Sequence, residues 1–175
     1  CGTSRQSRPP PSSGNDPLGC GNQRKAHGGP SFFAIIPRMK IAVIGDGGWG
    51  TANALLLAGY GHDVALWGAF PEYIDEMRRT RRNDRFLKGV EIPASIRLAS
   101  DRREAVEGAE VVVLAPPSKY FTSVVSGFKG LISPGTLVVS ITKGLCEKTN
   151  RRMTELGEEI LGTGPIVALA GPTHA

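Results

Sequence analysis

The sequence predicts an α/β protein built on a doubly wound parallel sheet. Short apolar runs typical of buried strands alternate with segments of helical periodicity from residue 40 onwards. A glycine-rich turn, GDGGWG, joins the first of these strands to the first helix. Strands that alternate with helices pair in parallel, and the connecting helices cover both faces of the sheet.

Six segments have the composition of strands, and two of them, KIAVIG and EVVVLA, are typical of buried strands. The first, KIAVIG, is a short continuous apolar run that begins at Lys40. The others are GHDVALW, SIRLA, EVVVLA, GTLVVSIT and PIVALAG, and turn residues separate them from the helical segments. Strands are therefore expected over residues 40–45, 61–67, 95–99, 110–115, 135–142 and 165–171.

Helices are expected between these strands. After the glycine turn, small and apolar residues recur at helical spacing at positions 52, 55, 56 and 59. Residues 71–82 open with a proline and acidic residues and close with arginines, which suits the helix dipole. Asp101, with Glu104 three residues further on, is a candidate N-cap for a helix over 101–109. Further helices are expected over 119–128 and 149–162.

Residues 1–38 differ in composition from the rest of the chain. They are rich in proline, glycine and serine, show no periodicity, and lack the apolar surface needed to form a core. We therefore expect a disordered leader over 1–38 and a folded domain over 39–175. Because Met39 directly precedes the first strand, we interpret it as the native start and the leader as upstream sequence. A transit peptide is the alternative, since the leader is basic and rich in serine.

Charge and cysteine content narrow the function classes. The formal net charge is +5, but the leader holds five basic residues and one acidic residue, so the remainder is nearly neutral. A nucleic-acid surface on the folded part is therefore not expected. No apolar run approaches the roughly 18 residues of a membrane span. The three widely spaced cysteines form neither a disulfide framework nor a zinc pattern, so we expect no metal site and a reducing compartment.

The glycine turn has the spacing G-x-G-x-x-G at Gly45, Gly47 and Gly50. In this pattern the first glycine allows a tight turn and the second lets the backbone approach a pyrophosphate. The third lets the helix pack closely on the sheet. Free amides at the helix start would then face the anion. The stretch therefore predicts a Rossmann dinucleotide-binding domain, with a plain strand-to-helix turn as the alternative.

The acid that usually selects NAD is missing. It is expected at the end of the second strand, about 20 residues beyond the glycines, where it binds the ribose hydroxyls. The strand ends instead in Trp67, Gly68, Ala69 and Phe70. Four arginines at 78, 79, 81 and 82 would reach a 2′-phosphate or form a solvated helix face. The choice between NAD and NADP stays open at this point.

Further motifs lie in a fixed order along the chain. GDGGWGTANALLLAGYGHDVALW, RRNDRFLKGVEIP, APPSKYF, ITKGL and LAGPTHA follow one another between Met39 and Ala175. Together they resemble the N-terminal part of the bacterial NAD(P)-dependent glycerol-3-phosphate dehydrogenases. The Trp-Gly-Thr-Ala stretch after the glycines and the Lys-Gly turn carry most of the likeness.

The resemblance implies an oxidoreductase. Family members transfer a hydride between NAD or NADP and C2 of a small-molecule substrate, interconverting dihydroxyacetone phosphate and sn-glycerol 3-phosphate for glycerophospholipid synthesis. It also implies a cytoplasmic homodimer and a helical C-terminal substrate domain that this chain lacks. We therefore expect this fragment to be inactive alone.

The resemblance also assigns roles to residues. Lys143 matches the active-site lysine, which polarises the carbonyl oxygen or serves in proton transfer. The predicted cofactor-binding residues are Gly45, Gly47, Gly48, Trp49, Gly50, Trp67, Phe86, Pro117 and Lys143. The predicted substrate-binding residues are Lys143, Gly171 and Thr173.

The chain departs from the family pattern at several positions. Ala69 stands where the family often has an arginine, and Pro116 replaces a valine in the turn before Pro117. Two other functions remain open from the sequence. One is a hydroxyacid or ketopantoate-type dehydrogenase with the same nucleotide domain. The other is a non-catalytic dinucleotide-binding module, which would not need Lys143.

Overall fold

The computed structural model describes residues 37–170. The predicted leader lies outside this range except for residues 37 and 38. The predicted substrate-binding residues Gly171 and Thr173 also lie outside the described residues. Within the described range, no helix is both long enough and apolar enough to cross a membrane.

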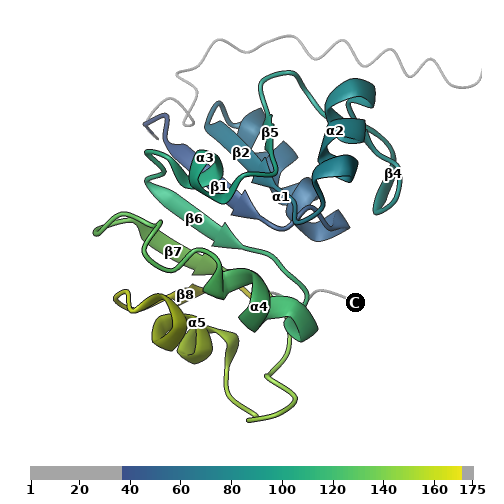
Figure 1. Cartoon of the computed structure of the whole chain (residues 1–175). Helices are drawn as coiled ribbons and strands as arrows, with labels where there is room; N and C mark the ends of the chain where they lie inside the picture. The colour runs from purple at the N-terminus through teal and green to yellow at the C-terminus, as the bar shows by residue number, and fades with distance from the viewer. Residues whose placement is uncertain (1–36, 171–175) are drawn as a thin grey trace, which may run out of the picture. The chain divides into compact units, whose positions relative to one another are not determined.

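A six-stranded sheet with the order β5-β2-β1-β6-β7-β8 forms the centre of the domain (Figure 1). All neighbouring strands in this sheet pair in parallel. The strands are β1 (Lys40–Ile44), β2 (Asp63–Trp67), β5 (Arg97–Ala99), β6 (Val111–Leu114), β7 (Leu137–Ser140) and β8 (Val167–Ala168). The direction of winding reverses between β1 and β6, and ligands of such sheets bind at this switch point, beyond the carboxyl ends of the strands.

Helices cover the sheet on both faces, which confirms the predicted doubly wound α/β fold. α1 (Gly48–Gly59) and α2 (Pro71–Thr80) contribute buried residues to one core cluster. α3 (Arg102–Val106), α4 (Phe121–Ser126) and α5 (Met153–Leu161) contribute to the other. All four residues of β6 are buried, as expected for a central strand covered on both faces.

A two-stranded hairpin follows α2 and was not expected from the sequence. The predicted helix over 71–82 ends at Thr80, because Arg81 adopts a left-handed conformation with φ 53°. The chain then forms β3 (Arg82–Asn83) and β4 (Leu87–Glu91), which pair antiparallel. The hairpin is short and polar, so its residues lack the alternation that identifies strands.

The remaining elements agree with the prediction in type but are shorter. Residues 119–128 form a 3₁₀ turn, η2 (Ser118–Tyr120), followed by α4. Asp101 caps α3 as predicted, since its carboxylate accepts a 2.8 Å hydrogen bond from the Glu104 amide. The strand expected over 165–171 is limited to the two residues of β8, because only Val167 and Ala168 pair with β7.

The core on the α3–α5 face provides a test of this packing. Phe128 is fully buried, and its ring meets the Trp67 ring edge to face with centroids 5.0 Å apart. We expect Phe128→Ala to lower the free energy of unfolding by about 3–5 kcal/mol, because it leaves a cavity in a packed core. Urea denaturation followed by circular dichroism measures this. The control is Phe70→Ala, whose side chain is 62% exposed and whose loss is expected to cost under about 0.5 kcal/mol. Equal losses in the two variants would contradict the assigned core.

Candidate functional site: the glycine loop and the cavity beside Lys143

The first and third glycines of the loop are required by the packing of the chain itself. Gly45 has φ +125°, and a Cβ there would lie 2.9 Å from the backbone carbon of Ala115. Its amide donates a 2.9 Å hydrogen bond to the Trp67 carbonyl, so the loop continues along the end of β2. A Cβ on Gly50 would lie only 1.9 Å from the Gly45 carbonyl oxygen. A side chain at either position would push α1 and the neighbouring turns away from β1.

The space around Gly47, in the middle of the loop, is open, unlike that around Gly45 and Gly50. Gly47 is the N-cap of α1, and a Cβ there would meet no atom within 4 Å. No side chain caps this helix, so the amides of its first turn have no partner within the helix. These amides also carry the positive end of the helix dipole. Space, unpaired donors and positive potential coincide here, and this combination fits the pyrophosphate of a dinucleotide.

The β3–β4 hairpin lies directly against the glycine loop. A Cβ on Gly48 would lie 2.6 Å from the Phe86 carbonyl oxygen, so Gly48 is needed for this contact. The Phe86 side chain is 48% exposed and meets the Tyr73 ring edge to face at 6.1 Å. Phe86 therefore presents an accessible aromatic ring next to the phosphate loop.

Asn83 joins the hairpin to the loop through four hydrogen bonds, although its side chain is buried. Its Nδ2 donates to the Asp46 carbonyl and to Thr51 Oγ1, both at 2.7 Å. Its Oδ1 accepts from the Tyr73 hydroxyl at 2.7 Å and from the Phe86 amide at 3.2 Å. A buried amide with all these bonds formed holds the loop, α1, α2 and the hairpin in one arrangement.

Asp46, between the first two glycines, is in an unusual environment. Its Oδ2 is buried and has no hydrogen-bond partner. Burial raises the pKa of this carboxyl above its ordinary value, while its own backbone amide and the charge of Arg85 act to lower the pKa. The desolvated carboxylate is therefore short of donors.

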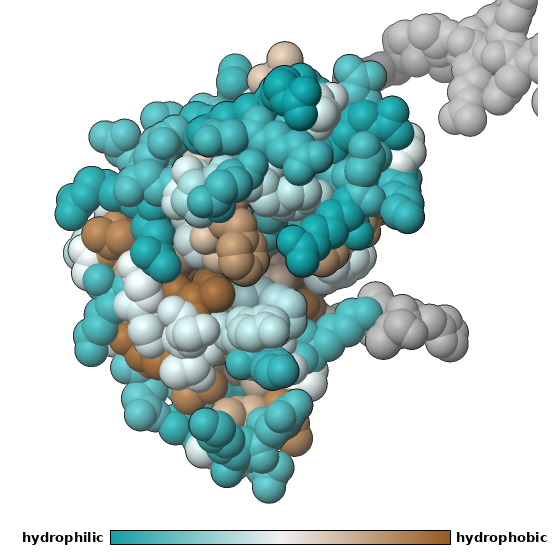
Figure 2. Space-filling model, turned by 45° about the vertical axis from the view of Figure 1, so that its right-hand side comes forward, coloured by the Kyte–Doolittle hydropathy of each residue, from teal (hydrophilic) through white to brown (hydrophobic). Residues whose placement is uncertain are grey.

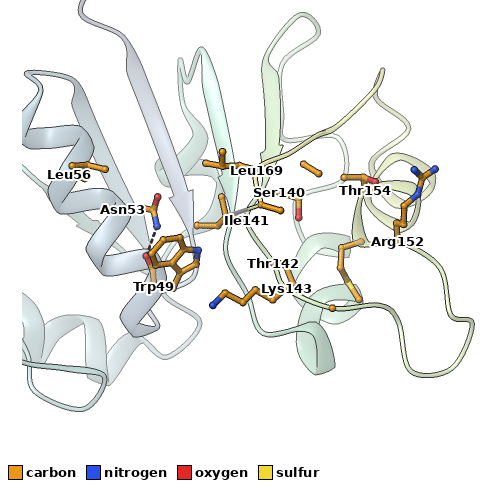
Figure 3. Close-up of a pocket in the computed structure, with 14 residues that line it drawn as sticks. Trp49, Asn53, Leu56, Ser140, Ile141, Thr142, Lys143, Arg152, Thr154 and Leu169 are labelled. Carbon is orange, nitrogen blue, oxygen red and sulfur yellow. Dashed lines mark hydrogen bonds between the residues drawn. The ribbon is translucent and has the colours of Figure 1, made fainter. Parts of the chain in front are cut away.

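Lys143 follows β7 and lies near the start of α1. Its ammonium nitrogen is 5.8 Å from the centre of the Trp49 ring, and Figure 3 shows the two side chains directed toward one another. Thr142 fixes the turn before the lysine, because its hydroxyl donates to the Pro116 carbonyl at 2.9 Å. The turns after β6 and β7 are thereby joined at the switch point of the sheet.

A cavity of about 660 Å³ adjoins this pair of residues. It is lined by Trp49, Asn53 and Leu56 of α1, by residues 140–144 after β7, by 152–154 at the start of α5, and by 168–170 (Figure 3). The lining is largely apolar and includes two cationic residues, Lys143 and Arg152, of which Arg152 pairs with Glu155 at 2.7 Å. A small anionic molecule would find apolar walls and fixed positive charge here.

Two other predicted cofactor-binding residues lie apart from the mouth of the loop. The Trp67 side chain is buried in the core, and its indole nitrogen donates to the Ser100 carbonyl at 2.9 Å. Its backbone carbonyl accepts a hydrogen bond from the Gly45 amide. Pro117 is exposed and begins η2, where its carbonyl accepts from the Tyr120 amide. Their binding roles stay predictions.

Three of the four arginines considered for a 2′-phosphate have structural partners. Arg78 pairs with Asp75 and also donates to the Leu98 carbonyl. Arg81 donates to the carbonyls of Ile92, Pro93 and Ile96. Arg82 pairs with Asp84. These bonds favour a structural role for the run.

Sequence reasoning missed Asp46, Thr51 and Asn83 as site residues. Thr51 and Asn83 are buried polar residues in segments that looked like an ordinary helix and an ordinary loop. Asp46 had one signal that could have identified it, because an acid stands between the glycines while the acid at the end of β2 is missing. Only the packing shows that these features are adjacent.

The strand order and the glycine loop define a dinucleotide-binding domain of the Rossmann type. The family model described as "NAD-dependent glycerol-3-phosphate dehydrogenase N-terminus" matches residues 40–175. The chain belongs to this family. This confirms the resemblance inferred from the motifs, and it confirms NAD or NADP as the cofactor class of the family.

Individual relatives agree with this family. The chain is 41% identical over 140 residues to a Glycerol-3-phosphate dehydrogenase [NAD(P)+] from Chlorobium phaeobacteroides, covering 78% of this chain and 42% of the relative. It is 39% identical over 137 residues to the protein of the same name from Geobacillus kaustophilus, covering 77% and 40%. A crystal structure of glycerol-3-phosphate dehydrogenase from Coxiella burnetii matches with a TM-score of 0.72 and 33% identity, covering 77% of this chain and 41% of that one. The chain thus spans less than half the length of these relatives.

The hydrogen bonds of Asn83 generate a prediction about stability. We expect Asn83→Ala to lower the free energy of unfolding by about 2–4 kcal/mol, because buried partners are left unsatisfied. Amide exchange in the glycine loop should accelerate as well. The control is Asn53→Ala, which removes one exposed bond to the Trp49 carbonyl and should change stability by under about 0.5 kcal/mol. If Asn83→Ala were as stable as this control, the buried network would not hold the loop.

Proposed function

We propose that this chain is the cofactor-binding part of an enzyme that interconverts sn-glycerol 3-phosphate and dihydroxyacetone phosphate with NAD or NADP. The observation that carries the proposal is the placement of Lys143 beside Trp49, at the mouth of an open glycine loop. The membership of the chain in the NAD-dependent glycerol-3-phosphate dehydrogenase family supports it. A dinucleotide-binding module without catalysis would not need a lysine at this place.

The glycine loop would hold the pyrophosphate of the cofactor. Amides of the first turn of α1 donate to it, and Gly47 leaves the space for its approach. Trp49 and Phe86 present exposed rings near the loop, and Pro117 lies in the turn after β6. The nicotinamide of the bound cofactor supplies or accepts the hydride.

Lys143 would act on the reacting oxygen of the substrate. An ammonium group stabilises the negative charge that develops on a carbonyl oxygen during reduction, and it can exchange a proton with the resulting hydroxyl. A substrate bound against the apolar walls of the adjoining cavity would displace water from the lysine, and this would strengthen the interaction. Arg152 lines the same cavity, but its guanidinium pairs with Glu155 at 2.7 Å, so Lys143 is the cation that we assign to the substrate.

The domain over residues 39–175 would function with a second domain that binds substrate. One face of β7 and β8 carries exposed apolar side chains, and the exposed fractions of Leu137, Val167 and Leu169 are 47%, 50% and 60%. Figure 2 shows hydrophobic side chains exposed between hydrophilic rims on one side of the molecule. A substrate domain packed near α1 and β8 would bury such surface. We propose that the complete enzyme is a cytoplasmic homodimer.

The open space at Gly47 allows a direct test of cofactor binding. We expect the wild-type chain to bind NADH saturably in a titration followed by the fluorescence of Trp49. Gly47→Ala should weaken binding at least about tenfold, because the added methyl group occupies the approach of the pyrophosphate. The control is Gly59→Ala, since a Cβ at Gly59 also meets no atom within 4 Å but lies at the far end of α1. Equal affinities in the two variants would contradict a pyrophosphate site at Gly47.

The role of Lys143 is tested in the enzyme completed by its substrate domain. Lys143→Ala should lower kcat for dihydroxyacetone phosphate reduction by at least roughly 100-fold, since a group acting on the reacting oxygen is lost. Lys148→Ala, in the exposed loop before α5, is the control and should keep full activity. The 175-residue chain alone is expected to bind NADH without turnover. Full activity of Lys143→Ala would remove the lysine from the mechanism.

A further inference from the structure

The end of β2 lacks the acid that binds adenosine ribose in NAD-dependent domains of this fold. The position directly after the strand is Gly68, and the next two residues are Ala69 and Phe70. None of the three side chains can accept a hydrogen bond from a ribose hydroxyl. A cofactor in this site would therefore find its usual ribose partner missing from β2.

The carboxyl group of Asp46 lies at this same place. A Cβ built on Gly68 would lie 2.7 Å from Asp46 Oδ2 and 2.8 Å from its Cγ. The Asp46 carboxyl thus occupies, together with Ile74 Cδ1 at 2.6 Å, the space that the side chain of residue 68 would otherwise fill. The parallel pairing of Ile44 with Trp67 and the bond from the Gly45 amide to the Trp67 carbonyl bring the two positions together. An acid at 68 and an acid at 46 exclude each other sterically.

The state of this carboxyl group fits a ligand contact. Its Oδ2 is buried and has no hydrogen-bond partner, whereas Oδ1 is not a buried atom without a partner. The residue as a whole is partly exposed. A polar group that the protein leaves without donors is suited to receive them from a ligand. The two neighbouring hydroxyls of a ribose are such donors.

We propose that Asp46 replaces the missing acid of β2, accepts hydrogen bonds from the adenosine ribose hydroxyls, and makes this chain select NAD over NADP. The proposal rests on the dinucleotide site proposed above. The 2′-phosphate of NADP is an acceptor with negative charge, so it would meet repulsion from the carboxylate in place of two hydrogen bonds.

One cation acts on Asp46 from the hairpin. The Arg85 guanidinium lies 5.2 Å from the centre of the Phe86 ring and 5.9 Å from that of Tyr73, and its charge favours the ionised carboxyl. Arg78, Arg81 and Arg82, near the end of α2, are engaged by carbonyls or aspartates. Without the negative charge of Asp46, Arg85 would attract the 2′-phosphate of NADP.

The test compares NADH and NADPH in fluorescence titrations of the 175-residue chain. We expect the wild-type chain to bind NADH at least about tenfold more tightly than NADPH. Asp46→Asn keeps the shape of the side chain but removes its charge, and it should reduce this ratio by roughly tenfold. Asp75→Asn is the matched control, because it removes an exposed charge on α2 that pairs with Arg78, and it should leave the ratio unchanged.

A transplanted acid separates ligand contact from a structural role. Asp46→Ala should lose the preference, and the double variant Asp46→Ala with Gly68→Asp should regain it. The acid then returns to β2, where the new Cβ requires only that the end of the Ile74 side chain, 2.6 Å away, rotates aside. Circular dichroism checks that each variant is folded. If Asp46→Asn does not fold, the wild-type ratio together with the double variant still decides the proposal.

Each outcome has a distinct meaning. A wild-type chain that binds NADPH as tightly as NADH, or more tightly, overturns the role of Asp46 and leaves the proposed dinucleotide site intact. An Asp46→Asn variant that weakens both cofactors equally also overturns the selection, because it shows that Asp46 only supports the loop. A folded chain that binds neither cofactor overturns the dinucleotide site and this proposal together.

Discussion

The close approach of α1 to the end of β1 is the constraint on which the site depends. Gly50 and the Gly45 carbonyl leave no room for a methyl group between helix and strand, and Gly45 packs equally tightly against the turn after β6. This contact places the uncapped start of α1 at the edge of the sheet where the carboxyl ends of the strands lie. The edge also carries the turns after β2, β6 and β7, because all these strands run parallel. Gly68, Ala115 and Lys143 therefore lie around one loop, although they come from distant parts of the chain.

The polar groups around the loop differ in how completely they are satisfied. Asn83 forms four hydrogen bonds, and the buried Thr51 takes part in the same network. Asp46 leaves a buried oxygen without a partner one residue from the first glycine. A native protein retains few unsatisfied buried polar atoms, and they concentrate where function requires them. Within Asp46, the side-chain carboxyl is therefore the group that lacks hydrogen bonds. Its backbone carbonyl accepts from Asn83 and from Thr51.

The surface around Lys143 is largely apolar and so differs in character from the glycine loop. Between α1 and β8 the sheet presents apolar side chains to solvent, and the cavity beside them is lined by segments from four parts of the chain. The relatives are more than twice as long as the matched region, so most of their length lies outside it. Lys143 lies on the rim of this domain, where under the proposed function it would act on a substrate held by a second domain. In that proposal, cofactor binding belongs to this chain and turnover requires the second domain.

The sequence by itself determined the class of fold and the path of the chain. Apolar runs separated by helical periodicity identify a parallel sheet, because burial on both faces requires continuous hydrophobic strands. The glycine spacing located the phosphate loop, and the motifs along 39–175 identified the family, since both depend on residues that are close in sequence. The tertiary structure decided what depends on distant contacts. The β3–β4 hairpin is held against the glycine loop by the hydrogen bonds of Asn83 and by the contact of Phe86 with Gly48. The Trp67 side chain is buried in the core, where it packs against Phe128. The juxtaposition of Asp46 and Gly68 arises only when β1 pairs with β2, because no local pattern records which side chain fills the space that a glycine leaves.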